Sequence, residues 1–216
     1  MKQMYSFVNK LWTPVGGTCP IQCGYCSTKA AMKRFAAVRA KYSGEPRLVG
    51  PWPRFKKGDT VFVCHMTDLF AMPSWIIVDV LTHCSLWPEA EYVFQTKVPW
   101  NVAPYLLTMP PRRVIGTTIE SDNETGWELR GNATRRLGNA GERTFVTVEP
   151  ITEFTEDFAD ILVSIGSSFV NIGADSKGHS LPEPTGAEVL GLIADLRAAG
   201  IEVRVKPNLA RITGKG

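Results

Sequence analysis

Short runs of apolar and β-branched residues recur along the chain and alternate with helix-like segments. The runs are rich in Val, Ile, Phe and Thr but lack the strict alternation of a half-exposed strand, which is typical of parallel strands covered on both faces. The pattern predicts seven strands, at Phe7–Trp12, Thr60–Cys64, Tyr92–Thr96, Val114–Ile119, Thr144–Val148, Phe169–Ile172 and Glu202–Val205.

The clearest predicted helix runs from Thr185 to Ala199. Thr185 and Glu188 have the spacing of a capping box, and Gly200 follows the last apolar position. Further helices are predicted at Ala30–Ala40, Pro73–Leu86 and Glu153–Ser164. Strand–helix alternation indicates an α/β fold with right-handed crossovers. Six or seven units in 216 residues are too few for an eight-unit barrel. We therefore expect a single domain over residues 1–216, a partial (β/α)6-type barrel or an open doubly wound sheet.

Polar residues follow nearly every predicted strand. In parallel α/β folds the carboxyl ends of the strands meet at one edge, where active sites gather. A single polar residue there is more commonly an ordinary start of a loop, but a ring of them favours a functional site. The strand ends read His65–Asp68, Thr96–Lys97, Thr118–Glu120, Glu149–Pro150, Gly173–Asp175 and Lys206–Asn208.

Three of the five cysteines lie within eight residues, at Cys19, Cys23 and Cys26. Thiolates are soft ligands that suit iron–sulfur clusters or zinc. Three cysteines leave one iron of a four-iron cluster open, as a catalytic centre requires. A structural zinc site, with His65 or Cys64 as fourth ligand, is the alternative, although zinc sites more often contain paired C-x2-C units. Cys64 and Cys84 are interpreted as buried small apolar side chains.

The C-x3-C-x2-C spacing, with Tyr25 directly before the last cysteine, resembles the signature of the radical S-adenosylmethionine (radical SAM) superfamily. Further blocks resemble a phage-associated radical SAM family that is distantly similar to spore photoproduct lyase. An expected Gly-Gly-Glu is replaced by Gly173-Ala174-Asp175. The other blocks are Trp12–Gly17, Met66–Phe70, Gln95–Lys97, Val148–Pro150 and Val205–Pro207.

The resemblance implies a radical SAM core with a [4Fe–4S] cluster on the three cysteines and S-adenosylmethionine (AdoMet) on the open iron. It implies cleavage of AdoMet to a 5′-deoxyadenosyl radical, with the protein binding and orienting the cofactor. Roles implied by position are Tyr25 at adenine, Met66, Thr67 and Asp68 near the amino group, Thr118 and Glu120 near the ribose or carboxylate, and Glu149 at the rim. Lys97 and Glu120 are also candidates for catalysis, and His65, Lys97, Asp175 and Lys206 for substrate contact.

The formal net charge is only +3, but the segment Lys29–Lys57 carries nine basic residues and one acid. Tyr42, Trp52 and Phe55 are interspersed there, a combination that suits phosphates and bases. A solvated basic helix face followed by a loop explains it equally well. The segment Glu149–Glu188 is acidic instead, with eight acids and one base.

Together these features favour an isomerase- or lyase-type radical SAM enzyme acting on a nucleobase in phage DNA, for example a hypermodified thymidine. The alternatives are the same chemistry on a free nucleoside or small molecule, as in deazapurine biosynthesis, and a non-catalytic iron–sulfur or zinc module that binds nucleic acid. We expect a flavodoxin or ferredoxin as electron donor. The sequence has no signal peptide and no run of the roughly 18 apolar residues needed to span a membrane, so we expect no membrane partner and a cytoplasmic location, the host's if a phage encodes the protein.

Overall fold

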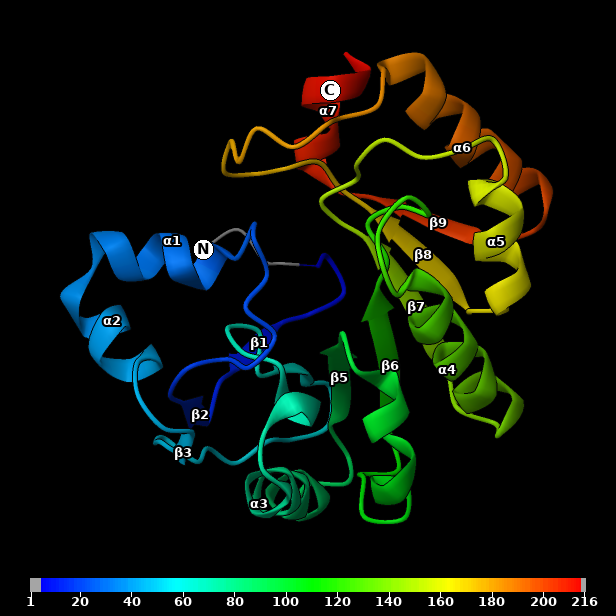
Figure 1. Cartoon of the computed structure of the whole chain (residues 1–216). Coiled ribbons are helices and arrows are strands. Elements are labelled where there is room, and N and C mark those ends of the chain that lie inside the picture. The colour runs from blue at the N-terminus through cyan, green and yellow to red at the C-terminus, as the bar shows by residue number, and fades with distance from the viewer. Residues whose placement is uncertain (1–4, 215–216) are drawn as a thin grey trace. The chain divides into compact units, whose positions relative to one another are not determined.

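The computed structural model describes residues 5–214, which divide into two compact units (Figure 1). The first extends to Ile115 and the second starts at Gly116. Strand β6 (Arg113–Thr118) contributes residues to both. The expectation of one domain over residues 1–216 stays a prediction.

The first unit is built on parallel strands in the order β1 (Lys10–Trp12), β4 (Thr60–Val63) and β5 (Glu91–Thr96). The register aligns Trp12 with Val63 and Val63 with Phe94, so these strands end at one level. Helix α3 (Ser74–Ser85) packs its buried face, with Ile76, Ile77, Val80 and Leu81, into the core of this unit. A small antiparallel pair, β2 (Val15–Gly16) with β3 (Arg47–Leu48), was not predicted.

The second unit repeats the parallel pattern with β7 (Thr144–Val148), β8 (Phe169–Ile172) and β9 (Glu202–Val205). Helices α4 (Trp127–Asn139), α5 (Phe158–Ile165) and α6 (Gly186–Ala198) lie along these strands (Figure 1). Its core includes a cluster of buried apolar residues, among them Val146, Leu162 and Leu192. A short helix, α7 (Ala210–Thr213), follows β9.

All seven predicted strands are present between residues 5 and 214, each within a few residues of its predicted bounds, so the mostly parallel α/β fold is confirmed. The capping box of α6 is confirmed too, with the Thr185 hydroxyl accepting from the Glu188 N–H and the Glu188 carboxylate accepting from the Thr185 N–H. Four single turns of 3-10 helix connect other elements, at Leu69–Ala71, Pro99–Asn101, Ala103–Tyr105 and Pro207–Leu209.

The helix predicted over Ala30–Ala40 is instead two helices, α1 (Ser27–Arg34) and α2 (Ala36–Tyr42). Phe35 separates them with an extended backbone. Neither Gly nor Pro marks this break. The Lys41 carbonyl at the end of α2 accepts the Gly17 N–H, which ties α2 to the segment that leads into the cysteines. Helix α5 also starts later than predicted, at Phe158.

Two of the three aromatics considered for base stacking lie in the core instead. Tyr42 and Phe55 are 5% and 6% exposed, whereas Trp52 is half-exposed and packs against Trp12. The stacking interpretation is therefore wrong for Tyr42 and Phe55. Within residues 5–214, the helices are too short or too polar to cross a bilayer.

Candidate functional site

The cysteine loop is anchored at its start by two glycines. Gly17 has a φ of +90°, and a Cβ there would lie 2.3 Å from the Glu45 carbonyl oxygen. A Cβ on Gly16 would lie 2.7 Å from the Lys41 carbonyl oxygen. These glycines therefore let the loop pack tightly against the backbone at the end of α2 and directly after it.

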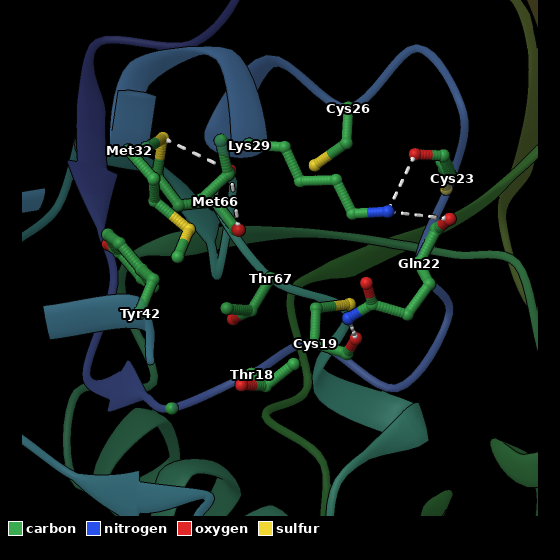
Figure 2. Close-up of a pocket in the computed structure, with 12 residues that line it drawn as sticks. Thr18, Cys19, Gln22, Cys23, Cys26, Lys29, Met32, Tyr42, Met66 and Thr67 are labelled. Atoms are coloured by element: carbon green, nitrogen blue, oxygen red, sulfur yellow. Dashed lines mark hydrogen bonds between the residues drawn. The ribbon is translucent and has the colours of Figure 1, made fainter. Parts of the chain in front are cut away.

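All three motif cysteines line one cavity of the first unit (Figure 2). The thiols of Cys19, Cys23 and Cys26 are partly buried, and none is in a disulfide. Burial raises the pKa of the Cys19 thiol, although backbone N–H groups of Asp68 and Ile21 act in the opposite direction. Helix α1 begins directly after Cys26. The loop therefore presents three ligand-type side chains between β2 and α1.

A lysine that the sequence analysis did not single out reaches into the same cavity. The Lys29 ammonium donates to the Gln22 carbonyl at 3.0 Å and to the Cys23 carbonyl at 3.4 Å. Figure 2 shows its side chain extending between Cys26 and the Gln22–Cys23 backbone. The sequence could have indicated this role, because Lys29 follows the last cysteine by three residues and lies on the helix after the loop. Lys29 brings a positive charge to a group of potential thiolates.

The donor set fits an iron–sulfur cluster. Each cysteine of a four-iron cluster binds a different iron, so the thiols need to surround a cavity rather than meet at one point. Among residues 5–214, no three His, Cys, Asp or Glu side chains converge on a position for one metal ion. A tetrahedral zinc ion would need four such donors. Lys29 also suits an anionic group held by three thiolates.

Two residues predicted to contact the cofactor, Met66 and Thr67, line this cavity. The Thr28 hydroxyl of α1 donates to the Met66 carbonyl at 2.8 Å, which ties the helix to the segment after β4. His65 lies beside them, with its Nδ1 2.8 Å from the Thr13 hydroxyl. Burial, assisted by the charge of Lys41, lowers the pKa of His65, so its imidazole is favoured as neutral.

Asp68 links the ends of two strands. One carboxylate oxygen accepts from the Thr96 hydroxyl and the other from the Lys97 N–H, each at 2.7 Å. Burial raises the pKa of Asp68, and these hydrogen bonds oppose the rise. Asp68 is not among the residues lining the cavity, so the observed contacts make it a clamp between the ends of β4 and β5.

Tyr25 and Lys97 are brought together, although they are far apart in the sequence. The Lys97 ammonium lies 4.9 Å from the centre of the Tyr25 ring, within the range of a cation–π contact. The Tyr25 hydroxyl is buried without a hydrogen-bond partner. The signature aromatic is therefore oriented by a residue from the end of β5.

In the second unit, Glu120 belongs to a buried ionic network after β6. Its N–H donates to Glu124 at 2.9 Å, and its carboxyl lies 3.7 Å from the Arg130 guanidinium, which also pairs with Glu124. Burial and the neighbouring Glu124 carboxylate raise the pKa of Glu120 to about 9, despite Arg130. These surroundings favour the protonated form of the Glu120 carboxyl. Thr118, at the end of β6, is also buried.

Glu149 and Lys206 pair with each other in the second unit. The Lys206 ammonium bonds one carboxylate oxygen of Glu149, and Asn208 donates to the other at 3.0 Å. A Cβ on Gly173 would lie 2.8 Å from that Glu149 oxygen, so glycine makes room for the pair. The ends of β7, β8 and β9 thus meet, as the rim of polar residues predicted.

Asp175 organises the loop that follows β8. It accepts from the Lys177 N–H at 2.9 Å and from the His179 ring at 2.7 Å. Burial alone would raise the pKa of Asp175, but these hydrogen bonds hold it below its usual value. Asp175, Glu183 and Arg211 also line a second cavity. His179, Glu124, Arg130 and Arg211 were not predicted, because their partners lie on separate segments or make no recognisable motif.

The comparisons with known proteins identify the fold. No family model matches the sequence, and no curated protein matches it. Among solved structures, spore photoproduct lyase in complex with a dinucleoside spore photoproduct is similar with a TM-score of 0.60 and 11% identity, covering 89% of this chain and 76% of that one. A variant of the same lyase with bound AdoMet and the same dinucleoside gives 0.57 and 10%, covering 94% and 74%. The α/β fold is therefore similar to that of spore photoproduct lyase.

Proposed function

We propose that this protein is a radical SAM enzyme that holds a [4Fe–4S] cluster on Cys19, Cys23 and Cys26 and modifies a nucleobase. One observation carries the proposal: the three thiols line a single cavity of the first unit. The fold adds support, because it is similar to that of a lyase seen with both AdoMet and a dinucleoside. The resemblance of the motif to the radical SAM signature points the same way.

The cluster and AdoMet together would supply one-electron cleavage and hydrogen abstraction, chemistry that protein side chains lack. The chain's own residues bind, orient and balance charge. Cys19, Cys23 and Cys26 supply the thiolates, and Lys29 offsets their negative charge. The pair of Tyr25 and Lys97 presents an aromatic face for adenine.

The residues after β4 serve the same site in this proposal. Thr28 fixes the Met66 backbone, so Met66 and Thr67 keep their places on the cavity wall. Asp68 holds the ends of β4 and β5 together and thereby positions both Thr67 and Lys97. We therefore assign Asp68 a positioning role beside the cofactor role that its sequence block implies.

The remaining proposed cofactor and substrate contacts are those that the sequence resemblance implies. We assign Thr118, Glu120 and Glu149 to the cofactor. Glu120 is favoured as a proton donor, because burial and the neighbouring Glu124 carboxylate raise its pKa and favour the protonated form. We assign His65, Lys97, Asp175 and Lys206 to the substrate. The Glu149–Lys206 pair would exchange its internal contact for contacts to bound groups.

The proposed reaction is an isomerisation or carbon–carbon bond rearrangement on a modified thymidine of phage DNA. The dinucleoside held by the structural neighbours supports this class of substrate. An electron donor such as flavodoxin or ferredoxin would reduce the cluster. Five free cysteines suit the reducing environment of the cytoplasm, the location we propose.

The test is anaerobic. The chain is reconstituted with iron and sulfide, reduced and given AdoMet, and 5′-deoxyadenosine is measured with and without DNA carrying modified thymidines. We expect about four irons per chain, product that rises with DNA, and an altered nucleoside after digestion. A fully loaded cluster that forms no 5′-deoxyadenosine would contradict the proposal and favour a binding module.

Matched cysteine variants show whether the motif carries the cluster. Cys23→Ala should lose both the cluster absorbance and AdoMet cleavage, because one thiolate of the loop is gone. Cys84→Ala should retain both, since Cys84 is buried within α3. Loss of the cluster in Cys84→Ala would show that the ligand assignment is wrong.

A further inference from the structure

An aromatic side chain projects from the turn between α1 and α2. Phe35 is 56% exposed, although aromatic side chains usually bury most of their surface. Its extended backbone separates the two helices, which form a corner (Figure 1). The corner therefore presents a flat apolar face to solvent, where the sequence predicted an uninterrupted helix.

Exposed basic residues flank Phe35 in the sequence. Lys33 and Arg34 occupy the last turn of α1 and are exposed, and Arg39 is exposed on α2. Arg39 also donates to the Met32 carbonyl at 3.4 Å, which links the two helices across the corner. The segment from Lys29 to Gly44 contains no acidic residue. The charge of the corner thus matches a polyanion.

The corner adjoins the cysteine cavity through α1. Lys29 and Met32 of this helix line the cavity, and Lys33, Arg34 and Phe35 follow directly. The nine residue steps from Cys26 to Phe35, which enclose the eight residues of α1, correspond to about 13 Å at the rise of a helix. In duplex DNA, successive phosphates of one strand lie about 3.4 Å apart along the helix axis, and a single strand can extend further per nucleotide. A strand held at the corner therefore spans the distance to the cavity with at most about four nucleotides.

We propose that Lys33, Arg34, Phe35 and Arg39 form a docking corner for DNA. The three cations contact phosphates of the backbone, and one base stacks on the Phe35 ring, the combination by which proteins hold single strands. The inference rests on the proposed function and makes its substrate a DNA strand rather than a free nucleoside.

The first test measures binding of labelled single-stranded DNA by fluorescence anisotropy, using the full reconstituted chain over a range of salt concentrations. The double variant Lys33→Ala/Arg34→Ala should bind more weakly. Its slope of log affinity against log salt should fall by about 1.4, because each lost phosphate contact on single strands removes about 0.7. The matched control is Lys56→Ala/Lys57→Ala, an exposed basic pair before β4, at the opposite end of the strands. Equal losses in both double variants would overturn the proposal.

The second test isolates stacking. Phe35→Ala should weaken DNA binding at least about fivefold, as the loss of a stacked base does, with an unchanged salt slope. Phe35→Trp should retain binding, and heparin, a polyanion without bases, should bind Phe35→Ala and the unaltered chain equally. An unchanged DNA affinity in Phe35→Ala, or the same loss for heparin, would overturn the docking corner. Cluster absorbance and circular dichroism establish that each variant is folded.

AdoMet cleavage without DNA separates this inference from the proposed function. If the chain cleaves AdoMet but all variants bind DNA equally well, the proposed enzyme activity stands and the docking corner is rejected. If the corner variants lose DNA binding but a fully loaded cluster never cleaves AdoMet, the docking corner stands and the proposed enzyme activity is rejected.

Discussion

Lys29 places a fixed positive charge beside three cysteine thiols, and its ammonium is held by two backbone carbonyls of their loop. The potential of an iron–sulfur cluster depends on nearby charge and hydrogen bonding. Lys29→Met removes the charge and keeps the length of the side chain. We expect the midpoint potential of the reconstituted cluster to fall by tens of millivolts, since the more negative reduced form loses a compensating cation.

The measurement is a redox titration followed by electron paramagnetic resonance, and Lys33→Met, one turn further along α1, is the matched control. A potential that is the same in Lys29→Met and in Lys33→Met would show that Lys29 does not influence the cluster.

Glu120 should make stability depend on pH. Its pKa is about 9 in the folded chain, against a reference value of 4.5. Between these values the folded chain keeps a proton that the unfolded chain has lost, so the free energy of unfolding decreases as pH rises. Glu120→Gln mimics the protonated carboxyl and should flatten this dependence from about pH 5 to about pH 9. Urea unfolding across this range measures it.

Exposed Glu128 on α4 provides the comparison, because Glu128→Gln should leave the slope as it is. A wild-type slope in Glu120→Gln would mean that Glu120 is ionised in the folded chain.

At the scale of elements, the start of the cysteine loop depends on one glycine. Gly17→Ala adds a Cβ at a positive φ and directs it at the Glu45 backbone. Such strain costs about 1–3 kcal/mol, so we expect that loss of unfolding free energy together with weaker retention of iron. Gly24, in the same loop, has open space around its Cβ position. Gly24→Ala should therefore change stability by less than about 0.5 kcal/mol, and equal effects of the two variants would contradict this account of the loop.

The elements that the sequence predicts are those whose signals are local. The seven strands follow from runs of β-branched and aromatic residues, and the start of α6 follows from the chemistry of Thr185 and Glu188. Helix α4 was missed because its buried face is small and polar, with Arg130, Gly131 and Thr134 among its buried residues. A hydrophobic pattern cannot reveal such a face.

In the candidate site, too, the residues with a local sequence signal were predictable and the contacts between distant segments were not. Cys19, Cys23 and Cys26 share a short loop, so their spacing alone predicts that they act together. The contact of Lys97 with Tyr25 and the pairing of Glu149 with Lys206 join segments far apart in the sequence. Their positions at strand ends were predictable, but their partners depend on how loops pack after the strands have paired.

At the scale of the whole molecule, β6 joins the two units because its residues belong to both. If either unit unfolds, the residues of β6 that belong to it lose their packing contacts. We therefore expect a single cooperative thermal transition in calorimetry, with equal calorimetric and van't Hoff enthalpies. Two resolved transitions would show that residues 1–216 comprise two domains rather than the one predicted.

Cys26 occupies the N-cap position of α1, and its side chain makes no capping hydrogen bond. A helix of eight residues has little stability by itself in water, so its population depends on whatever fixes its first turn. A ligand that immobilises the Cys26 thiol also nucleates α1, and through α1 it orders the turn that carries Phe35. If Cys26 binds the proposed cluster and Phe35 the proposed DNA strand, occupancy of the two sites would form one linked equilibrium, and loss of the cluster would weaken DNA binding.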